Sequence, residues 1–333
     1  MTPKQLTIFL ELAIRKKLPV LITGAPGVGK TAIGTLAARN AGADILFMHP
    51  VVSDPTDFKG LPAIVKDMAE FLPFGDLRRM IEADRALVVF IDDLGQAPAS
   101  VQAAAMQLLL SRCLNGQRIS DHVTFIAATN RHTDRAGVTG VLEPVKSRFN
   151  TIVSLEPDLD DFLHWCNGQG FPELFGPFLR FRPELLHNFK PTHELTNSAC
   201  PRTLDNFATW LKLGVRDFEV LSGAAGEDVA TQYLAFEEMA QTMPDPDAIL
   251  ADPAAHPAPP KDRLAVAYAL CGALAARVTA DTAENMFAYA AKLPQEFQAL
   301  LVKDTLTKSP VIATTQAFIR WAAANHNRNF GGM

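Results

Sequence analysis

The stretch of sequence that decides the fold is Gly24-Ala25-Pro26-Gly27-Val28-Gly29-Lys30-Thr31, which fits the pattern GxxxxGK(S/T). It follows an apolar run, PVLIT, and precedes a segment of helical periodicity at residues 30–40. Glycines let backbone N–H groups turn inward toward phosphate oxygens, and the start of the helix adds partial positive charge. We therefore expect an ATP site, in which Lys30 neutralises the β- and γ-phosphates and the Thr31 hydroxyl ligates Mg²⁺.

Other apolar runs along residues 1–155 have the length of strands that are buried on both faces. The expected strands lie at residues 19–23, 45–52, 86–92, 123–129 and 150–155. Helical patterns separate them, for example at residues 30–40 and 99–112. This alternation predicts an α/β fold with a five-stranded, mainly parallel sheet between layers of helices.

The strand signal fades after residue 156. Predicted helices follow at residues 159–166, 172–181, 201–213 and 264–278. Residues 243–261 are rich in proline, which cannot continue a helix, so we expect a linker or an extended wrapping segment there. The chain is predicted to divide into an αβα core at residues 1–156, an all-α domain at 157–245, and a linker with a helical C-terminal extension at 246–333.

The composition excludes several classes of protein. Of 333 residues, 48% are hydrophobic and 20% are charged, which excludes a largely disordered chain. The net charge of −5 disfavours a protein that mainly coats nucleic acid or an anionic membrane. The cysteines are far apart and predict neither a zinc site nor a disulfide framework. Without a signal peptide or a long apolar run, we expect a cytoplasmic protein with no membrane insertion.

Two of the expected strands end in polar side chains that suit a nucleotide site. Asp92 and Asp93 end the run at residues 86–92, and Asn130 follows the run at 123–129. Ligands of parallel sheets bind at the carboxyl ends of strands. We expect Asp92 to hold Mg²⁺ and Asp93 to orient or deprotonate the attacking water. Asn130 is expected to hydrogen-bond the γ-phosphate or that water, the alternative being an ordinary turn residue.

These three elements, in this order and spacing, resemble the AAA+ ATPases, and the surrounding segments resemble the MoxR-like branch. The segments that carry the narrower resemblance are SDPTDFKGLP at residues 53–62, QAP at 96–98, VQAA at 101–104, RHTDR at 131–135, KSRF at 146–149, FRPELL at 181–186 and PRT at 201–203. The likeness covers about residues 1–215 and thins beyond them. It implies a P-loop AAA+ core followed by a helical lid at residues 157–245.

The resemblance also implies a ring, usually a hexamer, with ATP at each subunit boundary. Arg148 matches the arginine finger, which reaches the γ-phosphate of the neighbouring subunit's ATP and stabilises transition-state charge. Arg202 matches sensor 2, a lid arginine that contacts phosphate. Arg131 and Arg135 are candidates without such a match, and Arg135 is the reserve candidate for a contact in trans. For each arginine the alternative is a solvated surface residue.

Two loops resemble insertions of this branch. Asn115-Gly116 is a hairpin signal just before the strand at 123–129. Residues 58–77 resemble the helix-2 insertion. Such insertions line the pore or one face of the ring, so Lys59, Leu61 and Phe74 are candidates for contact with a partner. The alternative is a packed surface loop.

One residue departs from the family pattern, because the family usually has glutamate where this chain has Asp93. An aspartate is one methylene shorter, and a displacement of about 1 Å from the best position costs about 10²-fold in rate. We therefore expect slow basal turnover that a partner raises.

The sequence favours an ATP-driven remodeller over two alternatives. The resemblance implies a ring that remodels or matures a protein client together with a separate von Willebrand factor A-type protein, since this chain has no DxSxS motif. The first alternative is a nucleic-acid motor, which the acidic composition disfavours. Its pore would be lined by basic residues such as Lys59, Lys66, Arg78, Arg79 and Arg118. The second is an ATP-gated assembly switch with slow turnover, which the short Asp93 side chain favours.

Overall fold

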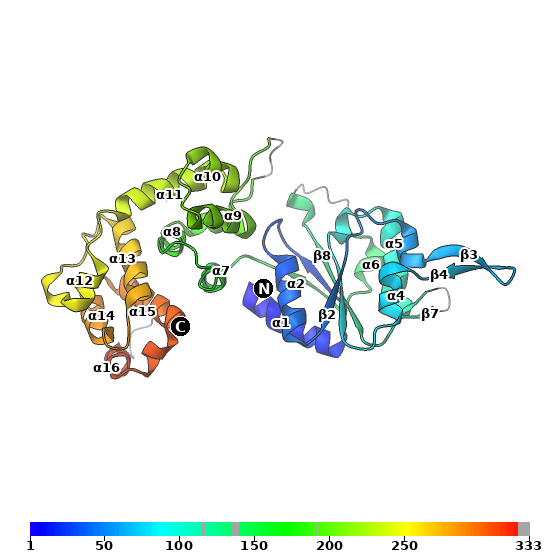
Figure 1. Cartoon of the computed structure of the whole chain (residues 1–333), viewed down its shortest axis with the longest axis horizontal. Coiled ribbons are helices and arrows are strands. Elements are labelled where there is room, and N and C mark those ends of the chain that lie inside the picture. The colour runs from blue at the N-terminus through cyan, green and yellow to red at the C-terminus, as the bar shows by residue number, and fades with distance from the viewer. Residues whose placement is uncertain (115–116, 135–139, 191, 193, 326–333) are drawn as a thin grey trace. The chain divides into compact units, whose positions relative to one another are not determined.

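The computed structural model describes residues 1–114, 117–134, 140–190, 192 and 194–325. The chain forms two compact units, Met1–Asp158 and Leu159–Met333. Figure 1 shows that the first unit contains a sheet with helices around it and that the second is built from helices.

A parallel sheet forms the centre of the first unit, with the strand order β2-β5-β8-β1-β9. Its strands are β1 (Val20–Thr23), β2 (Asp44–Met48), β5 (Leu87–Ile91), β8 (Val123–Thr129) and β9 (Thr151–Ser154). Every residue of β5 and β8 is buried, because helices cover both faces of this sheet. The predicted five-stranded α/β fold is confirmed.

Helices of the first unit form two layers, one on each face of the sheet (Figure 1). The helices of this unit are α1 (Pro3–Lys16), α2 (Lys30–Asn40), α3 (Pro55–Lys59), α4 (Gly75–Ile81), α5 (Ala99–Ser111), α6 (Glu143–Lys146) and the 3₁₀ turns η1 (Leu94–Gln96) and η2 (His132–Asp134). Helices α1 and α2 pack on Val20 and Ile22, whereas α3 to α6 share a core with Leu21. Successive strand residues point to opposite faces, so β1 supplies both cores.

Two antiparallel hairpins stand outside the sheet. Strand β3 (Leu61–Val65) pairs with β4 (Met68–Leu72) within the segment that resembles an insertion, and the hairpin projects from its unit (Figure 1). Strand β6 (Cys113–Leu114) pairs with β7 (Gln117–Arg118), as the hairpin signal predicts. The expected turn residues Asn115 and Gly116 lie outside the described residues.

The second unit is helical and contains two hydrophobic cores. Its helices are α7 (Leu159–Cys166), α8 (Phe175–Phe181), α9 (Pro201–Lys212), α10 (Phe218–Ala225), α11 (Glu227–Ala240), α12 (Pro246–Ala251), α13 (Leu264–Arg277), α14 (Ala283–Ala290), α15 (Gln295–Lys308), α16 (Gln316–Asn325) and the 3₁₀ turns η3 (Pro183–Leu186), η4 (Pro253–Ala255) and η5 (Pro310–Thr314). One core gathers side chains of α7 to α11, and the other gathers side chains of α12 to α15. Helix α13 contributes to both, through Ala265 and Ala269 on one side and Leu270 and Leu274 on the other.

The proline-rich segment is more ordered than the sequence suggests. It contains α12, whose first residue is Pro246, a position where the missing N–H of proline costs nothing. The Asp245 side chain accepts a hydrogen bond from the Asp247 amide at 3.0 Å and caps this helix. Ile249 and Leu250 are buried in the second core. The segment expected as a linker or wrapping segment thus includes a packed helix.

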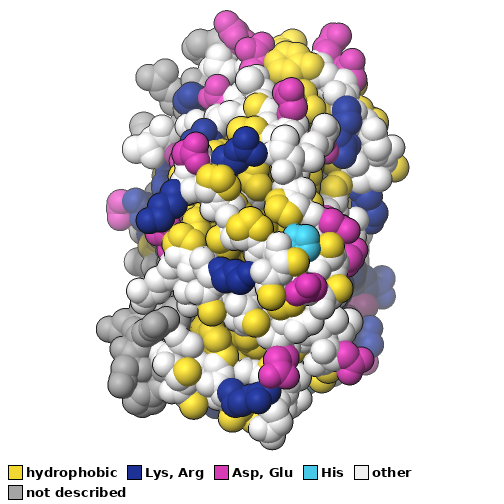
Figure 2. All heavy atoms as spheres, turned by 90° about the vertical axis from the view of Figure 1, so that its left-hand side faces the viewer, with side chains coloured by type: hydrophobic (Ala, Val, Ile, Leu, Met, Phe, Trp, Pro, Cys, Tyr) yellow, Lys and Arg dark blue, Asp and Glu magenta, His cyan; other side chains and the backbone are white. Residues whose placement is uncertain are grey.

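The surface shows mixed character. On the face drawn in Figure 2, lysine and arginine side chains are interspersed with acidic and hydrophobic ones. Among the described helices, none is long and apolar enough to cross a membrane.

Candidate active site

The glycine-rich loop lies between β1 and α2, where the motif requires it. Gly29 precedes α2 with φ 97°, in the left-handed region that favours glycine. Gly24 lies so close to the end of β9 that an added Cβ would be 2.9 Å from the carbonyl oxygen of Leu155. Both glycines therefore permit a loop shape that larger residues would strain.

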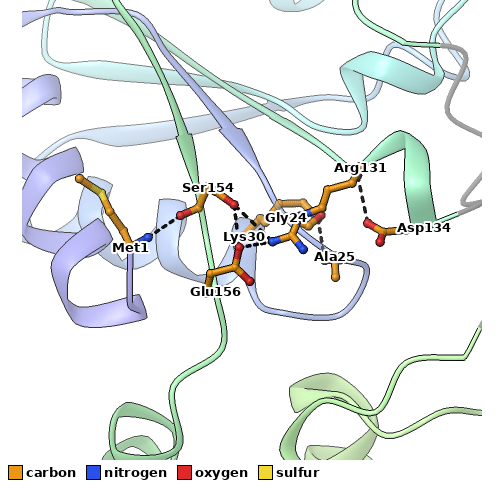
Figure 3. Close-up of polar contacts among 8 residues, drawn as sticks. All are labelled: Met1, Gly24, Ala25, Lys30, Arg131, Asp134, Ser154 and Glu156. Atoms are coloured by element: carbon orange, nitrogen blue, oxygen red, sulfur yellow. Dashed lines mark hydrogen bonds and ion pairs between the residues drawn. The ribbon is translucent and has the colours of Figure 1, made fainter.

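Lys30 is the first residue of α2, and its side chain lies against the loop (Figure 3). Its Nζ donates hydrogen bonds to the carbonyl oxygens of Gly24 and Ala25, at 2.9 and 3.0 Å. A third hydrogen bond reaches Asn130 Oδ1 at 2.7 Å. Lys30 is only 7% exposed, and a buried ammonium requires such acceptors. The lysine of the loop and the asparagine after β8 are thus in direct contact.

Thr31 and Asp92 form a second contact. Thr31 Oγ1 donates to Asp92 Oδ2 at 2.8 Å, and the Asp93 amide donates to Asp92 Oδ1 at 3.0 Å. Hydroxyl and carboxylate oxygens are hard ligands that suit Mg²⁺, which usually takes one or two protein carboxylates and completes its shell with water and phosphate. No group of three or more His, Cys, Asp or Glu residues forms a metal cage in the described ranges. The donor set therefore fits Mg²⁺ that arrives with a nucleotide.

Asp93 is connected to Lys30 through Asn130. Asn130 Nδ2 donates to Asp93 Oδ1 at 3.2 Å, while its Oδ1 accepts from Lys30. The backbone of Asp93 is left-handed, with φ 52° and ψ 36°. Aspartate and asparagine adopt this region more readily than other residues with a side chain. This backbone conformation favours aspartate over glutamate at the position.

The order of the strands explains why these residues meet. Strands β5, β8 and β1 are neighbours in a parallel sheet, so their carboxyl ends share one edge. Asp93 and Asn130 follow two of these ends, and the glycine-rich loop follows the third. The three sequence motifs are therefore brought together, as expected, although the catalytic roles given to their residues remain predictions.

Arg148 lies away from this group of residues. It precedes β9, and the amide of Asn150 donates to the carbonyl oxygen of Pro19, just before β1, at 2.9 Å. Arg148 thus stands at the amino ends of β1 and β9, and at about 3.3 Å per residue the four residues of β1 span about 13 Å. Its Nε is buried without a hydrogen-bond partner among the described residues. The structure does not bring Arg148 to the glycine-rich loop of its own chain.

The remaining candidates are placed as follows. Arg202 is an exposed residue in the first turn of α9, in the second unit. Arg135 lies outside the described residues. Lys59, Leu61 and Phe74 are exposed around the β3–β4 hairpin. These positions do not test the roles predicted for these residues.

The structure adds a contact that the sequence did not reveal. Arg131, directly after Asn130, forms an ion pair with Glu156 and donates to Ser154 Oγ at 3.3 Å (Figure 3). Its backbone amide donates to Asp134 Oδ2 at 3.1 Å. Glu156 follows the end of β9, so this pair ties the ends of β8 and β9 together. The only signal in the sequence was an acidic residue after an apolar run, which is common on protein surfaces.

The Arg131–Glu156 pair predicts an acid-sensitive contribution to stability. The hydrogen bond from Arg131 lowers the pKa of the Glu156 carboxyl from its usual 4.5. A lowered folded-state pKa stabilises the protein above the unfolded pKa, and this stabilisation is lost as pH falls through the folded value. Glu156→Gln should therefore lower the urea midpoint at about pH 7 and have a smaller effect below about pH 4. Urea titrations across this range measure the difference, and a constant difference would contradict the assignment.

Comparison with known proteins identifies curated relatives that match part of this chain. Proteasome-activating nucleotidase of Saccharolobus islandicus is 30% identical over 193 residues, which cover 53% of this chain and 42% of the relative. The same protein of Saccharolobus solfataricus is 30% identical over 189 residues, with 52% and 41% covered. The chain thus spans less than half the length of these curated relatives.

Solved structures give a more distant likeness. Thermotoga maritima RuvB, the Holliday junction branch migration motor, has 16% sequence identity and a TM-score of 0.37 over 79% of this chain and 78% of that chain. A similarity this weak has no bearing on function.

The family match falls on the part of the chain that holds the site. Residues 20–156 match the ATPase family associated with various cellular activities (AAA). This range begins at β1 and ends at Glu156, so it includes the glycine-rich loop, Asp92, Asp93 and Asn130. Residues 20–156 are therefore similar to AAA ATPase domains of the AAA+ superfamily, whose activity is ATP hydrolysis.

Proposed function

We propose that this chain is an ATP- and Mg²⁺-dependent remodeller of a protein client that works as a ring, most simply a hexamer. The observation that supports this most strongly is the connected set of side chains at the edge of the sheet. Lys30, Asn130 and Asp93 form one chain of hydrogen bonds, and Thr31 with Asp92 forms a second contact beside it. Such a set serves phosphate binding and water activation at the same place.

Binding of ATP would exchange the partners of Lys30. Its ammonium leaves the carbonyl oxygens of Gly24 and Ala25 for the β- and γ-phosphates, where charge-assisted hydrogen bonds are stronger. Asn130 Oδ1 then loses a donor and becomes available to the attacking water. Asp93, which accepts a hydrogen bond from Asn130, would take a proton from that water.

Mg²⁺ would be held by Thr31 and Asp92, and when bound it neutralises charge on the β- and γ-phosphates. The hydrogen bond between Thr31 Oγ1 and Asp92 Oδ2, at 2.8 Å, supports this assignment, because it holds the two oxygens close together.

The position of Arg148 supports a ring. Its side chain cannot serve its own loop from the amino ends of the strands, and its buried Nε has no partner among the described residues. A guanidinium in this situation is suited to the ATP of a neighbouring subunit, where it stabilises transition-state charge. Hydrolysis would then require assembly.

Replacement of Arg148 by alanine is expected to leave ATP binding intact and to reduce hydrolysis by about 10³-fold or more, the range seen when an arginine supplied in trans is removed. Binding is measured with a fluorescent ATP analogue and hydrolysis by phosphate release. Lys146→Ala changes a half-buried, ion-paired residue on α6; it is the matched control and should turn over normally. Wild-type turnover in Arg148→Ala would remove Arg148 from the mechanism.

We further propose that the client is a protein, engaged with a separate von Willebrand factor A-type partner as in MoxR-like systems. The curated relatives are named for the activation of a proteasome, a protein assembly. An Asp93→Asn variant should form ring-sized particles with ATP and retain the partner and client. Light scattering measures the particle mass, and affinity purification with ATP or ADP identifies bound chains. Monomers with ATP, or retention that ignores the nucleotide, would contradict the proposal.

The nucleic-acid alternative receives less support from the structure. Three of the basic residues that would line its pore are paired with acidic neighbours. These pairs are Arg78–Glu82 at 2.7 Å, Arg79–Asp76 at 3.4 Å and Arg118–Asp121 at 2.9 Å. Hydrolysis stimulated by single-stranded DNA, with a steep dependence on salt, would restore this alternative.

A further inference from the structure

Gln102 is a polar side chain buried inside the AAA ATPase domain. It lies on α5, is 1% exposed, and uses both ends of its amide. Its Nε2 donates to the carbonyl oxygens of Ala97 at 3.0 Å and Gly140 at 2.9 Å. Its Oε1 accepts from the amide of Leu142 at 3.0 Å. Buried side-chain amides with this many backbone partners fix the segments that they join.

The segment fixed by Gln102 leads to Arg148. Leu142 is the N-cap residue of α6, and its carbonyl oxygen accepts from the amide of Val145 at 2.9 Å. Val145 is fully buried and in turn accepts from the Arg148 amide at 3.1 Å. A short path of backbone contacts therefore runs from the Gln102 amide to Arg148.

Gln102 is also linked to the turn that follows Asp93, the proposed general base. The amide of Gly140 donates to the carbonyl oxygen of Gly95 at 3.2 Å, within the turn η1 that follows Asp93. The second partner of Gln102, Ala97, directly follows the same turn. Gln102 thus joins the turn after Asp93 to the segment that carries Arg148.

We propose that Gln102 is a positioning residue for Arg148: it holds the residue 140–148 arm in the orientation that presents Arg148 to the neighbouring subunit. The proposal rests on the proposed role of Arg148 in trans. Because the hydrogen bonds of Gln102 run to the backbone of Ala97, Gly140 and Leu142, its removal should displace the Arg148 that a subunit presents to its neighbour. The subunit's own Asp93 should still work. A displacement of the guanidinium by about 1 Å costs about 10²-fold in rate.

The variants are chosen to remove the hydrogen bonds with little change of volume. Gln102→Met fills the same space and loses all three contacts. Gln102→Glu keeps an acceptor for the Leu142 amide and loses the amide donor, so it remains informative if the methionine variant fails to fold. Gln107→Met is the matched control, since Gln107 is an exposed glutamine on the same helix. Each protein should bind ATP like the wild type, and the two Gln102 variants should lose about 10- to 100-fold in kcat with little change in KM.

Mixed oligomers then show which active-site part is affected. Asp93→Asn subunits lack the proposed general base of their own site but present an intact Arg148 to the neighbouring subunit. Arg148→Ala subunits keep their own site but offer no arginine. Each is mixed with Gln102→Met, and phosphate release is compared with that of the unmixed proteins.

A positioning role for Arg148 predicts that Asp93→Asn subunits restore activity to Gln102→Met and that Arg148→Ala subunits do not. The opposite pattern would place the defect in the subunit's own site and overturn the proposal. Equal behaviour in both mixtures, or wild-type kcat in both Gln102 variants, would leave Gln102 as a structural residue only and would also overturn it.

A control mixture separates this proposal from the proposed function. Asp93→Asn and Arg148→Ala subunits together should recover hydrolysis, because sites with an intact Asp93 receive an intact Arg148. If this mixture stays inactive, the role of Arg148 in trans is wrong and the proposal for Gln102 fails with it. If it recovers, the Gln102 mixtures test the positioning role alone.

Discussion

Lys30→Ala is expected to lower the affinity for ATP by about 100-fold or more. Lys30 would give charge-assisted hydrogen bonds to phosphate oxygens, and each such bond contributes about 1.5–3 kcal/mol. The loss of two of them corresponds to at least about two powers of ten in Kd, since 1.4 kcal/mol is about tenfold. Titration with a fluorescent ATP analogue measures the change.

The same substitution removes the ammonium that now holds Gly24, Ala25 and Asn130. A melting curve without nucleotide therefore has to show that the variant is folded. Lys17→Ala, at an exposed lysine just after α1, is the matched control and should bind ATP normally. Normal binding by folded Lys30→Ala would mean that the glycine-rich loop is not the phosphate site.

Asp93→Asn is expected to bind ATP and to lose about 10²- to 10⁴-fold in kcat, the usual contribution of a general base. The new amide has the shape of the carboxylate, and its oxygen can still accept from Asn130 Nδ2. It cannot take a proton from water. Single-turnover hydrolysis with preformed protein–ATP complex measures the loss.

Substitution of the neighbouring Asp92 is expected to have a different effect, on Mg²⁺ rather than on hydrolysis alone. Asp92→Asn should weaken the response to Mg²⁺ through its contact with Thr31, whereas Asp93→Asn should keep the Mg²⁺ dependence of ATP binding. Hydrolysis by Asp93→Asn at the wild-type rate would show that another group activates water. Rapid single-turnover hydrolysis by the wild type would argue against a simple ATP-gated assembly switch.

The sheet and its nucleotide loop were predictable because their signals are local. A run such as residues 123–129 is apolar throughout, and β8 occupies those same residues with every side chain buried. The glycine-rich loop is flanked in the sequence by a strand pattern before it and a helix pattern after it. Asp92, Asp93 and Asn130 follow because the carboxyl ends of parallel strands share one edge.

Other features depend on contacts between distant parts of the chain, which periodicity does not report. In the sequence, Gln102 is a single polar residue within an apolar helix. Its hydrogen-bond partners Gly140 and Leu142 lie about forty positions further along the chain. The left-handed backbone of Asp93 arises from a turn that the strand pattern does not contain. The helix inside the proline-rich segment was missed because Pro246 occupies the one helical position that tolerates it.

Helix α13 has a consequence for how the second unit responds to stress. Its Ala269 belongs to one hydrophobic core and the adjacent Leu270 to the other, so neither core can lose this helix and stay intact. Proteins open in roughly contiguous cooperative units, and we expect the helices packed around α13 to form one such unit. Mechanical force or proteolysis near the C-terminal helices should therefore also destabilise α9, the helix that carries Arg202. This effect needs no contact between Arg202 and the site of damage.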